Sequence, residues 1–77
     1  MPCRSPAQPL KRLGTNVRAC RESQKISQEQ LAGKANLDRT YIGGLERGER
    51  NATLKTLICV AEALGTTVSA LCEGIDA

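Results

Sequence analysis

The sequence predicts an all-α fold of five short helices in one small domain. Apolar residues recur at three- and four-residue steps in successive stretches, which is the spacing of one helix face. Ser, Thr and Asp stand before these stretches and Gly or Asn after them, as helix caps do, and no segment alternates like a strand. The 77 residues include one aromatic side chain, so the core must be aliphatic. We place the domain at residues 10–74, before a tail of residues 75–77.

The first helix is expected to begin near the tenth residue. Its apolar positions lie at helical spacing: Leu10, Leu13, Val17 and Cys20. The segment 23–25 breaks the pattern. Residues 1–9 contain three prolines, which favours a flexible arm. Arg4 in this arm is a weaker candidate for a phosphate or minor-groove contact.

The second helix has a strong start signal. Ser27 can cap the backbone and Gln30 follows three residues later, which makes an S-x-x-Q capping box. The helix is expected over residues 28 to about 35. Asn36 tolerates a left-handed backbone, so the chain can turn there.

A third helix follows after a tight break. Asp38 is its expected cap, residues 39–47 form it, and Gly48 ends it. Gly43 and Gly44 lie within it, and each lowers helix stability by roughly 1 kcal/mol relative to alanine. Two predicted hydrophobic staples fix the crossing of the two helices: Ile26 with Leu31, and Leu37 with Ile42. The pair forms a rigid helix-turn-helix, which presents one helix to the DNA major groove.

Two further helices are predicted near the end of the chain. Thr53 and Thr67 are their expected caps, and Gly65 and Gly74 their expected ends. The apolar side of the fourth helix is expected to contain Leu54, Leu57, Ile58, Ala61 and Leu64. The last helix contributes Val68, Leu71 and Cys72.

Charge is unevenly distributed along the chain. The net charge is +3, but residues 1–55 hold all 11 Lys and Arg against five acids, giving +6. Residues 56–77 hold three acids and no base, giving −3. A basic body of this kind suits a protein that turns one side to a polyanion.

Composition argues against several other classes of protein. No segment approaches the ~20 apolar residues of a membrane span, and no signal peptide is visible. The chain has no His and no C-x-x-C pair, which argues against a zinc site. No Gly-rich phosphate loop or carboxylate pair indicates an enzyme. Three cysteines fall in apolar helical patterns and are expected to be reduced thiols of a cytoplasmic protein: Cys20, Cys59 and Cys72.

At family level the sequence is recognisable. The segments SQEQLA, NLDRTYIGGLERGERN and TLKTLICVAEALG resemble the Cro/repressor-type (XRE-like) helix-turn-helix family, and most of all the controller proteins of restriction–modification systems. The resemblance implies a compact lambda-repressor-like domain and a transcription regulator that binds a palindromic DNA operator as a homodimer. RNA polymerase is a further candidate partner, and no cofactor, metal or small-molecule ligand is expected. Phage-type repressors and antitoxin regulators share this framework. A protein-interaction adaptor on the same fold is the alternative from another class.

Base contacts are expected at the first turn of the third helix. Arg39 can bond both O6 and N7 of guanine with its planar fork. Thr40 offers a hydroxyl and a methyl, and Tyr41 could meet phosphate, a base methyl or the core. Gly43 and Gly44 can allow the helix backbone close to DNA, or pack against a neighbouring helix.

Phosphate contacts are expected at the ends of the same two helices. Gln28 begins the second helix and resembles the phosphate-clamping glutamine of the family. Arg50 and Asn51 match positions that contact phosphate in controller proteins. The full predicted set is Gln28, Arg47, Arg50, Asn51, Lys55 and Thr56.

The resemblance also implies two structural contacts. Arg21, late in the first helix, is expected to bridge Glu46 at the end of the third. The fourth and fifth helices are expected to carry the dimer contact, with Leu64, Thr67, Val68 and Leu71 as candidates.

Overall fold

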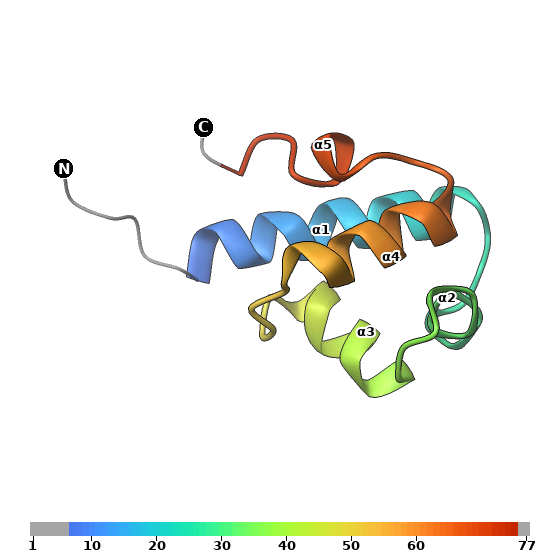
Figure 1. Cartoon of the computed structure of the whole chain (residues 1–77). Helices are drawn as coiled ribbons and strands as arrows, with labels where there is room; N and C mark the ends of the chain where they lie inside the picture. Colours follow the sequence, from blue (N-terminus) through green and yellow to red (C-terminus); the bar gives the residue numbers. More distant parts are fainter. Residues whose placement is uncertain (1–6, 76–77) are drawn as a thin grey trace, which may run out of the picture.

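The computed structural model describes residues 7–75, and within them it contains five α-helices and no strand. The helices are α1 (Ala7–Ser23), α2 (Gln28–Ala35), α3 (Arg39–Arg47), α4 (Leu54–Leu64) and α5 (Val68–Leu71). The longest helix, α1, runs through the middle of the molecule, with α5 on one side and α2 and α3 on the other (Figure 1). The predicted all-α fold is confirmed.

Helix α1 begins at Ala7, earlier than the hydrophobic pattern indicated. The expected boundary at residue 10 was wrong because Pro9 was taken as part of a non-helical arm. Pro9 instead lies in the first turn of the helix, where backbone N–H groups have no intrahelical partner and proline costs little. The remaining arm residues, Arg4 among them, lie outside the described residues.

Side-chain caps begin three of the four later helices. Ser27 Oγ accepts a bond of 3.0 Å from the Gln30 backbone N–H, and Gln30 Oε1 accepts one of 2.7 Å from the Ser27 N–H. This is the predicted capping box. Thr53 and Thr67 cap α4 and α5 through the backbone N–H groups three residues later, at 3.2 and 3.0 Å.

Asp38 differs from these caps. It precedes α3 with the extended backbone of a cap residue (φ −73°, ψ 143°), but its side chain makes no capping bond. The prediction was therefore right about the position of the cap and wrong about its hydrogen bond. The third residue of α3 is Tyr41, which has no acceptor that could complete a reciprocal box.

Left-handed backbone ends α2, α3 and α4. Asn36, Gly48 and Gly65 have φ values of 58°, 78° and 68°, as the sequence predicted for these three positions. Lys25, in the turn after α1, also has a φ of 58°. A residue with a Cβ is strained in this left-handed conformation. No sequence pattern around Lys25 predicts it.

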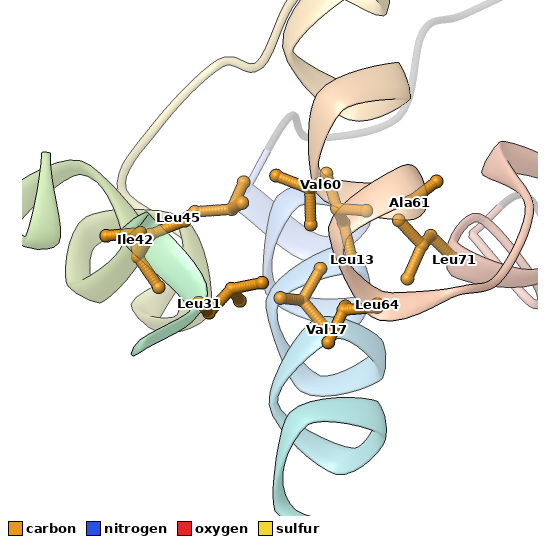
Figure 2. Packing of buried hydrophobic residues seen from close by; sticks show 10 residues of the cluster. Leu13, Val17, Leu31, Ile42, Leu45, Val60, Ala61, Leu64 and Leu71 are labelled. Carbon is orange, nitrogen blue, oxygen red and sulfur yellow. The ribbon is translucent and has the colours of Figure 1, made fainter. Parts of the chain in front are cut away.

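The core is aliphatic and joins all five helices (Figure 2). Its ten members are Leu13, Val17, Leu31, Ala32, Ile42, Leu45, Val60, Ala61, Leu64 and Leu71. The outer members of the predicted staples, Ile26 and Leu37, pack against this cluster. Ile75, expected in the tail, also packs there.

Two predictions about α4 and α5 were wrong. Leu54 and Ile58, expected on the inner side of α4, are 65% and 44% exposed. Leu64 and Leu71, expected at a dimer contact, are only 3% and 2% exposed because they fill the core of a single chain. Their side chains therefore have no free surface for a partner.

Gly14 allows α1 to lie directly against the end of α3. A Cβ at this position would lie 2.5 Å from the Leu45 carbonyl oxygen and 2.7 Å from the Glu46 carbonyl carbon. Only glycine permits this approach without a shift of the backbone, since both neighbours are main-chain atoms.

The segment after α5 is held along α1. Asn16 Nδ2 donates to the carbonyl oxygens of Leu71 and Glu73, both at 2.8 Å. Arg12 Nε donates to the Glu73 carbonyl at 3.3 Å. These bonds run from successive turns of α1 to the carbonyl groups that the short α5 leaves free.

Candidate nucleic-acid interface

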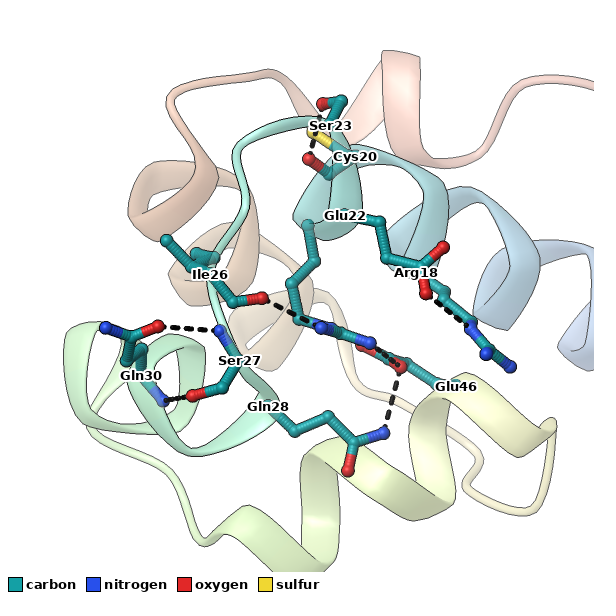
Figure 3. A network of polar contacts seen from close by, with 10 residues as sticks. Arg18, Cys20, Glu22, Ser23, Ile26, Ser27, Gln28, Gln30 and Glu46 are labelled. Carbon is teal, nitrogen blue, oxygen red and sulfur yellow. Dashed lines mark hydrogen bonds and ion pairs between the residues drawn. The ribbon is translucent and has the colours of Figure 1, made fainter.

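A polar network links α1, the start of α2 and the end of α3. Arg21 Nε donates to Glu46 Oε2 at 2.7 Å, and Arg21 Nη2 donates to Glu46 Oε1 at 3.1 Å. Arg21 Nη1 also donates to the Ile26 carbonyl at 2.8 Å (Figure 3). The side chains of Arg21 and Glu46 are only 11% and 3% exposed. The hydrogen bond to Glu46 raises the pKa of Arg21 above its usual value.

Gln28, the expected phosphate ligand of α2, belongs to the same network. Its Nε2 donates to Glu46 Oε1 at 3.0 Å (Figure 3). Glu46 thus fixes a side chain of α2 as well as one of α1. The backbone N–H of Gln28, at the first position of the helix, stays without an intrahelical partner and can still meet an anion.

The first turn of α3 projects into solvent. Arg39 and Thr40 are exposed, and Tyr41 is half-buried against the edge of the core. The Arg50 guanidinium lies over the Tyr41 ring, with its Cζ 5.6 Å from the ring centroid, in a cation–π contact. Tyr41 therefore packs on one side and supports a cation on the other.

Arginine side chains cover both glycines of α3. A Cβ at Gly44 would lie 2.9 Å from Arg50 Nε, and one at Gly43 would lie 3.1 Å from Arg47 Nη1. Both glycines are buried. The glycine backbone is not bare, because guanidinium groups form the outer surface here. The alternative of contact with a neighbouring helix holds in part at Gly43, where a Cβ would lie 3.6 Å from Oε1 of Gln28 in α2. The spacing of Gly43 and Arg47 is a signal that could have indicated one of these contacts.

The other predicted phosphate ligands are exposed or half-buried. Arg47 Nε forms an exposed ion pair of 3.2 Å with Glu49. Asn51 and Lys55 are exposed, and Thr56 accepts a 3.0 Å bond from the Thr53 hydroxyl, which leaves its own proton free to donate. Cationic and polar side chains of α3, of the loop after it and of the first turn of α4 thus share one region of the chain.

The helix-turn-helix family profile matches residues 17–71 of the chain. The chain belongs to this family. The match includes both helices of the motif, α2 and α3, together with the α1 residues that the Arg21–Glu46 network ties to them.

Several known proteins are similar to it. Control protein C.SmaI of Serratia marcescens is 56% identical over 59 residues, which cover 77% of this chain and 70% of that protein. An immunity repressor protein of Bacillus phage phi105 is 48% identical over 59 residues, 77% of this chain but only 41% of the phage protein. The crystal structure of the restriction-modification controller protein C.AhdI from Aeromonas hydrophila matches with a TM-score of 0.79 and 40% identity, over 80% of this chain and 94% of that one. The resemblance predicted from the sequence is confirmed.

The described residues of this helix-turn-helix protein offer few other sites. No helix in residues 7–75 is long and apolar enough to cross a membrane. Within the same residues, no three His, Cys, Asp or Glu side chains gather as metal ligands would. The thiols of Cys20, Cys59 and Cys72 are free and half-buried. Cys20 and Cys72 pack against the core, as the sequence predicted.

Proposed function

We propose that this protein is a sequence-specific DNA-binding transcription regulator of the restriction–modification controller type. The observation that carries the proposal is the rigid α2–α3 unit, with arginine side chains lying across its exposed helix. The control proteins among its relatives support the same function. In this proposal the protein regulates transcription and catalyses no reaction. It acts in the cytoplasm, where it meets the DNA.

Base contacts fall to the first turn of α3, which lies in the major groove. Arg39 bonds guanine O6 and N7, and such a contact is worth about 1–3 kcal/mol of discrimination. Thr40 and Tyr41 contact a thymine methyl or the adjacent phosphate. Gly43 and Gly44 contribute indirectly, because they make room for the arginines above them.

Phosphate contacts position the protein on both sides of the groove. Their donors are Gln28, Arg47, Arg50, Asn51, Lys55 and Thr56. Arg47 leaves its exposed partner Glu49 at little cost, since exposed ion pairs are worth about 0–1 kcal/mol.

The regulator acts as a homodimer on a palindromic operator, with half-sites about 34–36 Å apart. Thr67 and Val68 remain candidates for the dimer contact because they are exposed and half-buried, respectively. Leu54 and Ile58 join them in this proposal. They lie four residues apart on one face of α4 and are the large hydrophobic side chains exposed among residues 7–75. A second copy of the chain would remove them from water.

A phage-type repressor is the second candidate, and the phage immunity repressor among the relatives favours it. Such a repressor would bind DNA in the same way but regulate other genes. RNA polymerase is a candidate partner under either function.

Fluorescence anisotropy tests the proposal. The protein is titrated onto a duplex selected from a randomised pool and onto a scrambled duplex, each at several salt concentrations. We expect tighter binding to the selected duplex and a steep loss of affinity with salt, since each phosphate contact adds about 0.9 to the slope of log K against log salt.

Two variants control the experiment. Arg50→Ala should weaken both duplexes and flatten the salt slope. Arg18→Ala removes the same charge from an exposed α1 side chain that pairs with Glu22, and should change little. Equal binding of selected and scrambled duplexes by the wild-type protein would rule out a sequence-specific regulator and leave the adaptor.

A further inference from the structure

Among the N-cap residues of α2 to α5, Asp38 is the one whose side chain makes no capping bond. Ser27, Thr53 and Thr67 each bond the backbone N–H three residues later, whereas the Asp38 carboxylate leaves that group of α3 unbonded. Aspartate is among the best capping residues, so the chain holds a strong cap at this position without using it.

The Asp38 carboxylate is also unpaired. Within residues 7–75, Glu46 and Glu49 at the other end of α3 form ion pairs with Arg21 and Arg47, while Asp38 forms neither an ion pair nor a side-chain hydrogen bond. It is exposed and stands directly before Arg39, which is itself exposed. Two free groups of opposite charge thus begin the helix to which we assign base contact.

The unpaired Asp38 carboxylate has two opposite effects on DNA binding. DNA phosphates repel it, so it weakens binding to DNA of any sequence. In the major groove, however, a carboxylate accepts hydrogen bonds only, and cytosine offers it the N4 amino donor. Guanine and thymine present acceptors there, which a carboxylate repels, and adenine has its N7 acceptor directly beside its N6 amino donor.

We propose that Asp38 determines sequence specificity beside Arg39, by accepting a hydrogen bond from a cytosine N4 amino group. This inference rests on the proposed DNA-binding function. Because the two residues are adjacent in the chain, the cytosine lies in the base pair next to the one whose guanine Arg39 contacts. The exposed carboxylate thus acts mainly by rejecting other bases.

The test uses the duplex that the wild-type protein selects and the full set of its single base-pair substitutions. The wild-type protein should lose about tenfold in affinity when the cytosine is replaced, as a mismatched base pair typically costs. Asp38→Ser keeps a good helix cap and removes the charge. It should bind random DNA more tightly and discriminate less than about twofold at the cytosine, while its preference at the guanine persists.

Two further variants separate the possible roles of Asp38. Asp38→Asn should shift the preference at the same base pair toward adenine, because an amide can bond adenine N6 and N7. Arg39→Ala should lose the guanine preference and keep the cytosine preference. Far-UV circular dichroism of each variant checks that the total helix content is that of the wild type.

Two results would overturn the inference. Asp38→Ser could retain every base preference of the wild type, or it could weaken all duplexes alike, which would make Asp38 a helix-stabilising charge only. Failure of the proposed function looks different, because the wild-type protein itself would then select no sequence.

Discussion

The contact between α1 and α3 at Gly14 can be tested by adding one methyl group. Gly14→Ala would place a Cβ against the carbonyl groups of Leu45 and Glu46 at 2.5 to 2.7 Å, well inside van der Waals contact. Because these are main-chain atoms at the end of α3, no rotamer change can relieve the clash. The helices must separate instead.

Gly33→Ala provides the matched control. Gly33 also lies in a helix, α2, but a Cβ there would meet nothing within 4 Å. Alanine should therefore stabilise the protein by about 1 kcal/mol through helix propensity alone. Gly14→Ala gains the same amount and loses about 1–3 kcal/mol to overpacking, with the larger cost expected against backbone. We expect it to destabilise the fold by about 1–2 kcal/mol, so the two variants should differ by about 2–3 kcal/mol.

Urea unfolding followed by circular dichroism measures both variants at one protein concentration, since association would otherwise change the apparent stability. In thermal unfolding, 1 kcal/mol corresponds to about 4–8 °C for a domain of this size. A Gly14→Ala protein as stable as Gly33→Ala would show that α1 and α3 do not approach each other as described.

Three further substitutions test other contacts. Lys25→Gly should stabilise the protein by about 0.5–1 kcal/mol in chemical denaturation, because glycine relieves the strain of the left-handed backbone. Asn36→Gly should stabilise it less, because asparagine tolerates that backbone. Equal gains in stability would contradict the strain at Lys25. Glu46→Gln should lower the free energy of unfolding by about 2 kcal/mol in the same measurement, since the nearly buried Arg21 loses its charged partner. An unchanged free energy of unfolding would contradict a stabilising role of this ion pair. Gly44→Ala should displace Arg50 from the α3 surface and weaken DNA binding about tenfold in anisotropy, as expected for about 1.4 kcal/mol, while helix propensity adds about 1 kcal/mol of stability. Unchanged binding would show that DNA binding does not use the position of Arg50 over Gly44.

Local chemistry made most of the fold predictable from the sequence. Ser27, Asn36 and Gly48 mark helix boundaries through capping bonds and left-handed backbone that any helix end requires, so their positions could be inferred without tertiary structure. Pro9 misled the prediction because proline breaks a helix interior but not a first turn.

The exposed and buried sides of α4 and α5 could not be inferred in the same way. Leu54 and Leu64 both lie at helical spacing, yet one is 65% exposed and the other 3%. The difference depends on which turns of α4 pack against α2 and α5, and the periodicity of α4 does not encode this.

The candidate site was predictable as a set of residues but not as an arrangement. The resemblance supplied Arg21 and Glu46, and their ion pair is present. The bond from Gln28 to Glu46 and the place of Arg50 over Gly44 had no sequence signal, because each joins residues from different segments through side-chain conformation.

The way Asn16 holds the end of the chain has an evolutionary consequence. Its amide binds the carbonyl oxygens of Leu71 and Glu73, and every amino acid carries such an oxygen. The residues of α5 can therefore mutate without losing their anchorage to α1, provided that Leu71 still fills the core. If α5 takes part in pairing two copies, related regulators in one cell can diverge in this helix and avoid mixed dimers while their DNA-binding helices stay unchanged.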